Sequence, residues 1–166
     1  MTTANTKTLT LSNPMIYVWT TVFVAANVLF PQVVHLMPLG GKALLPIMLF
    51  TLIASVRFGL YAGLLTAALS PLVSYLLCGM PDGAMLTAVY AKSLVIALTF
   101  GLWKMSGRAF NLLNMALLII GVQFFCFVIE RTLIFGIPAV WSDLLISWPG
   151  MILQLLGGFL VVKYWK

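Results

Sequence analysis

The stretch AMLTAVYAKSLVIALTFGLWKM, residues 84–105, decides the fold class of this chain. It is apolar over about 20 residues, the length that a helix needs to cross the hydrocarbon core of a bilayer. Its interior carries a single charge, Lys92. Because lipid offers no partner to a free backbone N–H or C=O group, a spanning segment is either a helix or a strand of a closed barrel. The sequence lacks the alternation of apolar and polar residues typical of barrel strands, so the stretch predicts a transmembrane helix.

The composition of the whole chain also indicates a membrane protein. Of its 166 residues, 63% are hydrophobic and 7% are charged, and the mean hydropathy is +1.13. These values lie far outside the range of water-soluble domains. Spans of about 20 residues with short loops would take up nearly the whole chain. We therefore expect one membrane domain over residues 1–166, in which residues 1–13 form a polar cytoplasmic segment and no signal peptide is removed.

Apolar runs predict an all-α, polytopic fold with six transmembrane helices. The expected spans cover about residues 14–34, 43–58, 59–78, 84–105, 110–135 and 143–162. The second span is short enough to be tilted, shielded by protein or partly re-entrant. Pro31 is expected to kink or end the first span, and Pro149-Gly150 is expected to kink or unwind the sixth.

Basic residues set the expected orientation, because those near spans are retained in the cytoplasm. With the N-terminus inside, the cations on the inner side are Lys7, Arg57, Lys104, Arg108, Lys163 and Lys166. Lys42 and Arg131 then lie outside, and an even number of spans returns the C-terminus to the cytoplasm. The net charge of +6 comes from cations scattered between apolar runs, which fits anionic lipid headgroups and predicts no nucleic-acid partner.

The sequence offers little for catalysis, metal binding or a cofactor. It contains one His and three acidic residues, and it has none of the common nucleophile, zinc or phosphate-loop motifs. The two cysteines, Cys78 and Cys126, lie inside apolar runs and read as packed thiols. We therefore expect a protein that is not an enzyme and that holds neither a metal nor a cofactor.

Polar residues inside the spans are the candidates for a binding site, because a charge in the bilayer interior is costly and is retained for a reason. Lys92 lies about 12 Å below the outer end of its span, at 1.5 Å per residue. It has two open interpretations: a salt bridge with Glu130 that holds two helices together, or a counter-charge for an anionic ligand. Weaker candidates for substrate binding are Gln123, Asn27, Trp148, Gln154 and His35.

Small and turn-forming residues complete the expected architecture. In the third span, Gly59, Gly63 and Ala67 repeat at four-residue spacing and predict a face for close helix packing. Thr66, Ser70 and Ser74 form a polar stripe on the same helix, for which hydrogen bonds to the backbone one turn earlier are the simplest role. Outer connections rich in Gly and Pro are candidates for a lid, with Pro38, Gly40, Gly79 and Pro81 as their marker residues.

In its length, its six expected spans and the order of its turns, the chain resembles a substrate-binding S-component of an energy-coupling-factor (ECF) vitamin transporter. The segments that carry the resemblance are PQVVH (31–35), PLGGKALLP (38–46), FGLYAG (58–63), SP (70–71) and GMP (79–81). The resemblance covers about half of the chain, from Pro31 to Gly101. It implies a bacterial plasma-membrane protein that captures a vitamin-like molecule from outside and carries out no ATP chemistry itself.

The same resemblance implies partners for the chain, and the chain departs from the family pattern at two places. The implied partners are a transmembrane coupling protein and two ATPase subunits. Small residues on the first helix usually face the coupling protein in this family, and here Thr21 and Ala25 are a weaker version of that ridge. Several relatives carry Glu near the position of Lys92, and the reversed charge favours a ligand with a carboxylate or phosphate. The alternative from another class is a structural or scaffold subunit of a bacterial envelope complex.

Overall fold

The computed structural model describes residues 8–34, 46–79, 83–129 and 148–165. These residues form helices and no strand, which confirms the predicted all-helical fold for this part of the chain. The helices are α1 (Met15–Val34), α3 (Pro46–Phe58), α4 (Leu60–Cys78), α5 (Gly83–Met105), α6 (Leu112–Ile129) and α8 (Trp148–Tyr164). Among the predicted site and lid residues, His35, Pro38, Gly40, Pro81 and Glu130 lie outside the described residues.

Four of the described helices are long and apolar enough to cross a membrane: α1, α4, α5 and α6. The apolar helices α3 and α8 are shorter. Large apolar side chains are exposed on the outer faces of the bundle, for example Leu77 on α4 and Leu113 and Phe124 on α6. Exposed apolar surface of this extent is not stable in water, and lipid is the solvent that suits it. The described helices therefore have the composition and surface of a membrane protein.

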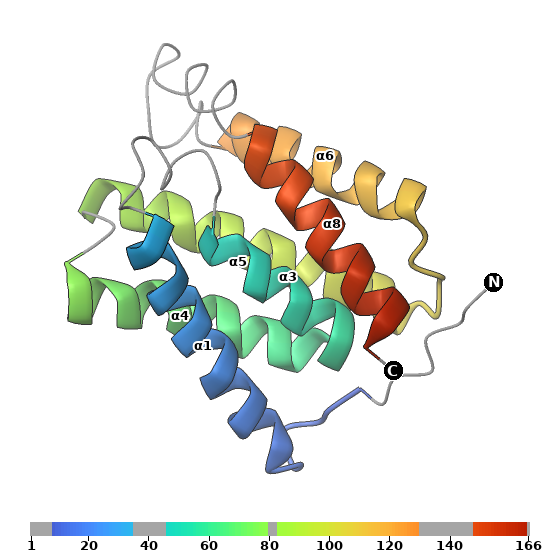
Figure 1. Ribbon diagram of the computed structural model, residues 1–166, viewed down its shortest axis with the longest axis horizontal. Coiled ribbons are helices and arrows are strands. Elements are labelled where there is room, and N and C mark those ends of the chain that lie inside the picture. Colours follow the sequence, from blue (N-terminus) through green and yellow to red (C-terminus); the bar gives the residue numbers. More distant parts are fainter. Residues whose placement is uncertain (1–7, 35–45, 80–82, 130–147, 166) are drawn as a thin grey trace.

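Helix α3 lies at the centre of the bundle, in contact with α1, α4, α5 and α8 (Figure 1). Its 13 residues rise about 20 Å, less than the thickness of the hydrocarbon core. Nearly all of its described side chains are buried. The short second span is thus shielded by its neighbours, one of the three arrangements that its length predicted.

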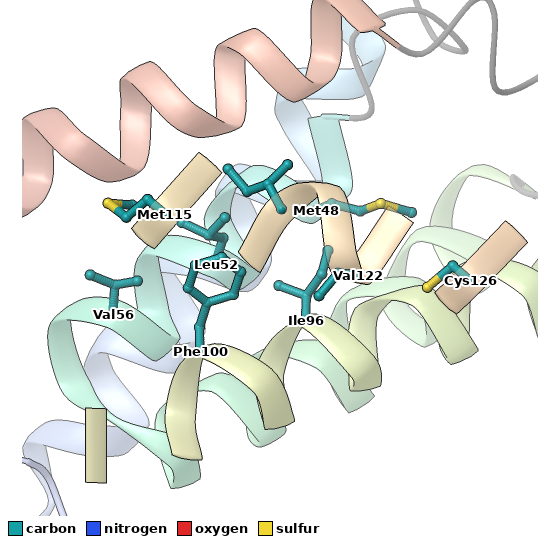
Figure 2. Packing of buried hydrophobic residues seen from close by; sticks show 9 residues of the cluster. Met48, Leu52, Val56, Ile96, Phe100, Met115, Val122 and Cys126 are labelled. Atoms are coloured by element: carbon teal, nitrogen blue, oxygen red, sulfur yellow. The ribbon is translucent and has the colours of Figure 1, made fainter. Parts of the chain in front are cut away.

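Two apolar clusters pack against opposite sides of α3. One joins α3 to α5, α6 and α8, and Figure 2 shows Leu52 of α3 between Phe100 of α5 and Met115 of α6. The other joins α3 to α1 and α4 through Phe23, Phe58 and further buried residues. Because α3 contributes to both clusters, it holds the two halves of the bundle together.

Small residues bring the helix backbones close. A Cβ atom built on Gly63 of α4 would lie 2.1 Å from Ser55 Oγ and 3.2 Å from Ser55 Cα of α3. On α5, a Cβ atom at Gly101 would lie 2.7 Å from the Cα atom of Leu60. Of the predicted packing face, Gly63 and Ala67 are buried as expected, whereas Gly59 precedes α4 and a Cβ atom there would lie 3.1 Å from Thr8 Cγ2. This face of α4 therefore packs against α3 of the same chain.

The carbonyl groups that end α3 all have donors. The chain turns at Gly59, whose φ of +95° is a conformation that favours glycine, and its N–H donates to Ser55 O at 3.0 Å. The N–H of Leu9 donates to Phe58 O at 2.9 Å. Lys104 of α5 donates from Nζ to Val56 O at 3.0 Å and to Arg57 O. A cation at a helix C-terminus also interacts favourably with the helix dipole, so Lys104 fixes the end of α5 to the end of α3.

The prolines fit their helices without ending them early. Pro31 lies inside α1, which continues to Val34, so this residue does not terminate the helix at its own position. Pro149 lies in the first turn of α8, where the missing N–H would have no partner in the helix. An interruption of the sixth span before Trp148 would fall outside the described residues. Gly79 ends α4 in the left-handed conformation, with its N–H donating to Tyr75 O at 2.9 Å.

Candidate functional site

Polar side chains are buried between helices that are otherwise apolar. They are Thr20, Asn27, Thr51, Ser55, Thr66, Ser70, Ser74, Ser93, Gln123 and Gln154. Cross-helix hydrogen bonds join members of the group on α1, α3 and α4. Buried polar atoms without a partner among the described residues occur in both groups. They are Thr20 Oγ1 and Asn27 Oδ1 in the first group, and Ser93 Oγ and the Nε2 atoms of Gln123 and Gln154 on α5, α6 and α8.

Asn27 is fully buried and joins three helices. Its Nδ2 donates to Ser70 Oγ of α4 at 2.8 Å and to Thr51 Oγ1 of α3 at 3.3 Å. Its Oδ1 is buried and has no partner in the described part of the chain. Ser55 and Thr66 donate to the carbonyl groups of Thr51 and Ala62, each one turn earlier, at 2.8 Å. Asn27 therefore holds α1 against α3 and α4, and its described contacts fit a structural role.

Replacing Asn27 with Ala is expected to lower the free energy of unfolding by about 1 to 2 kcal/mol, because two buried cross-helix hydrogen bonds are lost. Asn114→Ala is the matched control, since Asn114 Nδ2 donates only to Ala109 O at an exposed position. We expect that variant to stay within about 0.5 kcal/mol of the parent. Denaturant unfolding in mixed micelles measures both, and equal losses would contradict the structural role of Asn27.

The second polar group comes from α5, α6 and α8, helices that also contribute to or pack against the first apolar cluster. Gln154 is 1% exposed, Ser93 is fully buried and Gln123 is buried. The Nε2 atoms of both glutamines and the Oγ of Ser93 are buried without a hydrogen-bond partner in the described residues. A buried polar group without a partner costs about 1 to 3 kcal/mol, so groups of this kind call for water or a ligand.

These three residues lie near the middle of their helices. Lys104 marks one end of the bundle, because it is near the C-terminus of α5 and binds the C-terminus of α3. Trp165, just after α8, packs on Phe58 at that end as well, with ring centroids 5.9 Å apart. Ser93 lies at the middle of α5, and Gln123 and Gln154 lie two to three residues past the middle of α6 and α8, on the side away from Lys104. These buried polar residues at similar depth are the candidate site.

The other predicted site residues have different surroundings. Lys92, next to Ser93 on α5, is partly buried. Its predicted pairing with Glu130 stays a prediction, because Glu130 lies outside the described residues. Trp148 begins α8 and is 61% exposed, so within the described residues it does not join the buried amides.

Sequence reasoning missed Thr51, Ser55 and Ser93. Thr51 and Ser55 stand four residues apart in α3, the spacing that singled out the stripe on α4, so the same rule could have identified them. Ser93 was not singled out, because the charge of the adjacent Lys92 is the stronger signal in the sequence. Which of these hydroxyl groups meets a partner depends on contacts between helices, and a single sequence does not carry that information.

The described residues contain no group of three His, Cys, Asp or Glu side chains that could hold a metal ion. Both cysteines are described, and neither Cys78 nor Cys126 forms a disulfide. A groove of about 400 Å³ between α5 and α6 is lined mainly by apolar side chains, including Leu98, Val122 and Phe125. Its lining suits an apolar chain better than a polar ligand.

Comparison with known proteins assigns neither a family nor a function to the chain. Neither the protein-family models, nor the curated proteins, nor the solved structures contain a match to this chain.

Proposed function

We propose that the chain is the substrate-binding membrane subunit of an ECF-type importer. It has six spans, both ends lie in the cytoplasm, and it resides in a bacterial plasma membrane. It captures a vitamin-like small molecule from outside and delivers it through a coupling protein and two ATPase subunits. One observation carries the proposal: Gln123 and Gln154 hold buried amide donors without partners between apolar helices.

Unpaired amides favour a binding protein over a scaffold. A buried polar network that only joins helices is stable when its members bond to one another, as Asn27, Thr51 and Ser70 do. A site built for a ligand leaves donors open until the ligand arrives. Carbonyl, carboxylate and phosphate oxygens are the acceptors that such donors take, and Lys92 nearby on α5 would favour an anionic one.

The distribution of charge supports the orientation. Arg57, Lys104, Arg108 and Lys163 gather at one end of the bundle, which we call the basic end. Basic ends face the cytoplasm in polytopic proteins. The half with Gln123 and Gln154 then faces outward, as capture from outside requires.

Helix α1 supplies a surface for the coupling protein. Thr21 and Ala25 are both exposed on it, and Thr21 Oγ1 donates to Tyr17 O of its own helix at 2.9 Å. Gly63 and Ala67 of α4 are buried against the rest of the chain and are not available to a partner. The ridge on α1 is therefore a better candidate for this contact than the small-residue face of α4.

Native mass spectrometry of the detergent-purified protein tests the proposal. We expect a small-molecule adduct at one copy per chain, or thermal stabilisation by one member of a panel of riboflavin, thiamine, biotin, folate, pantothenate, pyridoxine and haem. Gln154→Leu should weaken binding of that molecule at least about tenfold, because a desolvated hydrogen bond contributes on the order of 1.4 kcal/mol or more. The exposed Gln32→Leu is the matched control and should bind as the parent does.

The stability of the empty protein separates the two function classes. If the Nε2 donor of Gln154 serves a ligand, replacing this side chain with an apolar one leaves the empty fold as stable or raises its stability by about 1 kcal/mol. A loss of stability in Gln154→Leu, with no adduct and no stabilising molecule for the parent, would instead support the structural or scaffold subunit.

A further inference from the structure

At the basic end, Arg57 holds its guanidinium group against aromatic rings. Its Cζ atom lies 5.6 Å from the ring centroid of Phe58 and 5.7 Å from that of Trp165. Trp19 closes the aromatic cluster, 5.0 Å from Phe58 and 5.2 Å from Trp165 between ring centroids. Cation–π contacts of this kind hold a guanidinium plane in place but satisfy none of its N–H donors.

The Nε atom of Arg57 is buried and has no acceptor among the described residues. Lys104 is directly beside it, with Nζ on the backbone carbonyl of Arg57. No carboxylate of the described residues balances these two cations, because the acidic side chains of the chain are Asp82, Glu130 and Asp143. A fixed guanidinium with an open donor next to a second cation is a site for an anion.

We propose that Arg57 and Lys104 bind the phosphate of one anionic phospholipid. Phosphate matches the planar fork of a guanidinium, which can donate two parallel hydrogen bonds to its oxygens. The source is lipid because the site lies at the ends of apolar helices among Trp19, Trp103, Tyr164 and Trp165, and such aromatic residues mark the headgroup level of a membrane. The inference does not depend on the importer, since a scaffold protein with this end would bind lipid equally.

The site differs from a diffuse basic surface. Arg108 and Lys163 lie at the same end but are exposed, and each stacks on side chains within five residues of it in the sequence. Arg57 instead stacks on rings from two elements, α3 and the residue after α8, with Lys104 of α5 alongside. Three parts of the fold thus fix its position, and a fixed donor loses less entropy on binding.

Native mass spectrometry with phosphatidylglycerol and phosphatidylcholine tests the site in the full chain. For the parent we expect one tightly held phosphatidylglycerol and weaker binding of phosphatidylcholine. Arg57→Gln should weaken phosphatidylglycerol binding about tenfold, the effect of one charge-assisted pair. Arg108→Gln removes the same charge at an exposed position and should change binding less than about threefold. Equal losses in the two variants would mean a diffuse surface charge and would overturn the proposal.

Two further measurements distinguish a lipid site from a site for a soluble anion, and a planar guanidinium from a simple positive charge. Inorganic phosphate should displace little of the bound lipid; if it displaces the lipid fully and Arg57→Gln abolishes phosphate binding as well, the site takes a soluble anion and the lipid assignment is wrong. Arg57→Lys keeps the charge but loses the planar fork, and it should bind phosphatidylglycerol more weakly than the parent and more tightly than Arg57→Gln. If Arg57→Gln does not fold, Arg57→Lys alone tests the proposal. In that case, an affinity of Arg57→Lys for phosphatidylglycerol equal to that of the parent would overturn the proposal.

Discussion

Lys104→Met is expected to lower the free energy of unfolding by about 3 kcal/mol. Lys104 Nζ donates to the carbonyl groups of Val56 and Arg57, and both bonds are charge-assisted. Methionine keeps most of the apolar length of the side chain but leaves these two carbonyls at the end of α3 without a donor. Denaturant titration in mixed micelles, followed by circular dichroism, measures the loss.

Lys163→Met is the matched control for that experiment. Lys163 is exposed at the same end of the bundle, and its contacts are with the rings of Phe159 and Tyr164. An exposed cation–π contact contributes about 0.5 to 1 kcal/mol, so this variant should lose no more than that. If Lys104→Met were as stable as Lys163→Met, the end of α3 would not depend on Lys104.

Gly101→Ala is expected to destabilise the bundle by about 3 kcal/mol or to prevent folding. The added Cβ would lie 2.7 Å from the Cα atom of Leu60, so a backbone would have to move, and inserting atoms into a well-packed core costs typically 1 to 3 kcal/mol or more. Because α4 and α5 pack along their lengths, the shift would spread through the bundle. Thermal unfolding in detergent, checked by size-exclusion chromatography, measures the effect.

Gly121→Ala provides the control for Gly101→Ala. Gly121 is also inside a long apolar helix, but a Cβ atom there would meet nothing within 4 Å. Alanine has the higher helix propensity by about 1 kcal/mol, so this variant should be as stable as the parent or more stable. A similar loss in both variants would show that helix flexibility, and not the contact with Leu60, sets the stability.

The helices could be predicted from the sequence because each depends on a local apolar run. The expected and observed ends agree within a few residues for α1, α4 and α5, and α3 ends at Phe58 as predicted. The central position of α3 could be predicted only in part. Its short length indicates that neighbouring helices must cover it, but does not indicate which helices do so. That choice depends on contacts such as Gly63 with Ser55, which join residues from different helices.

The site was harder to predict for the same reason. Sequence reasoning named Asn27, Gln123 and Gln154 as polar residues in spans, and all three are buried. It could not separate Asn27, which has partners on two other helices, from the two glutamines, whose Nε2 atoms have none among the described residues. It counted Lys104 only as an inner cation, because the carbonyls that it binds are 47 and 48 residues earlier in the chain.

The gathering of Arg57, Lys104, Arg108 and Lys163 at one end has an electrical consequence. Each charge carried across a membrane potential of 100 mV involves about 2.3 kcal/mol of work, and four such charges involve about 9 kcal/mol. In a membrane that is negative inside, this work favours the basic end on the cytoplasmic side and opposes inversion of the bundle. Any rotation that carries Arg57 toward the bilayer centre would also work against the field, so the voltage across the membrane would itself help to keep the protein upright.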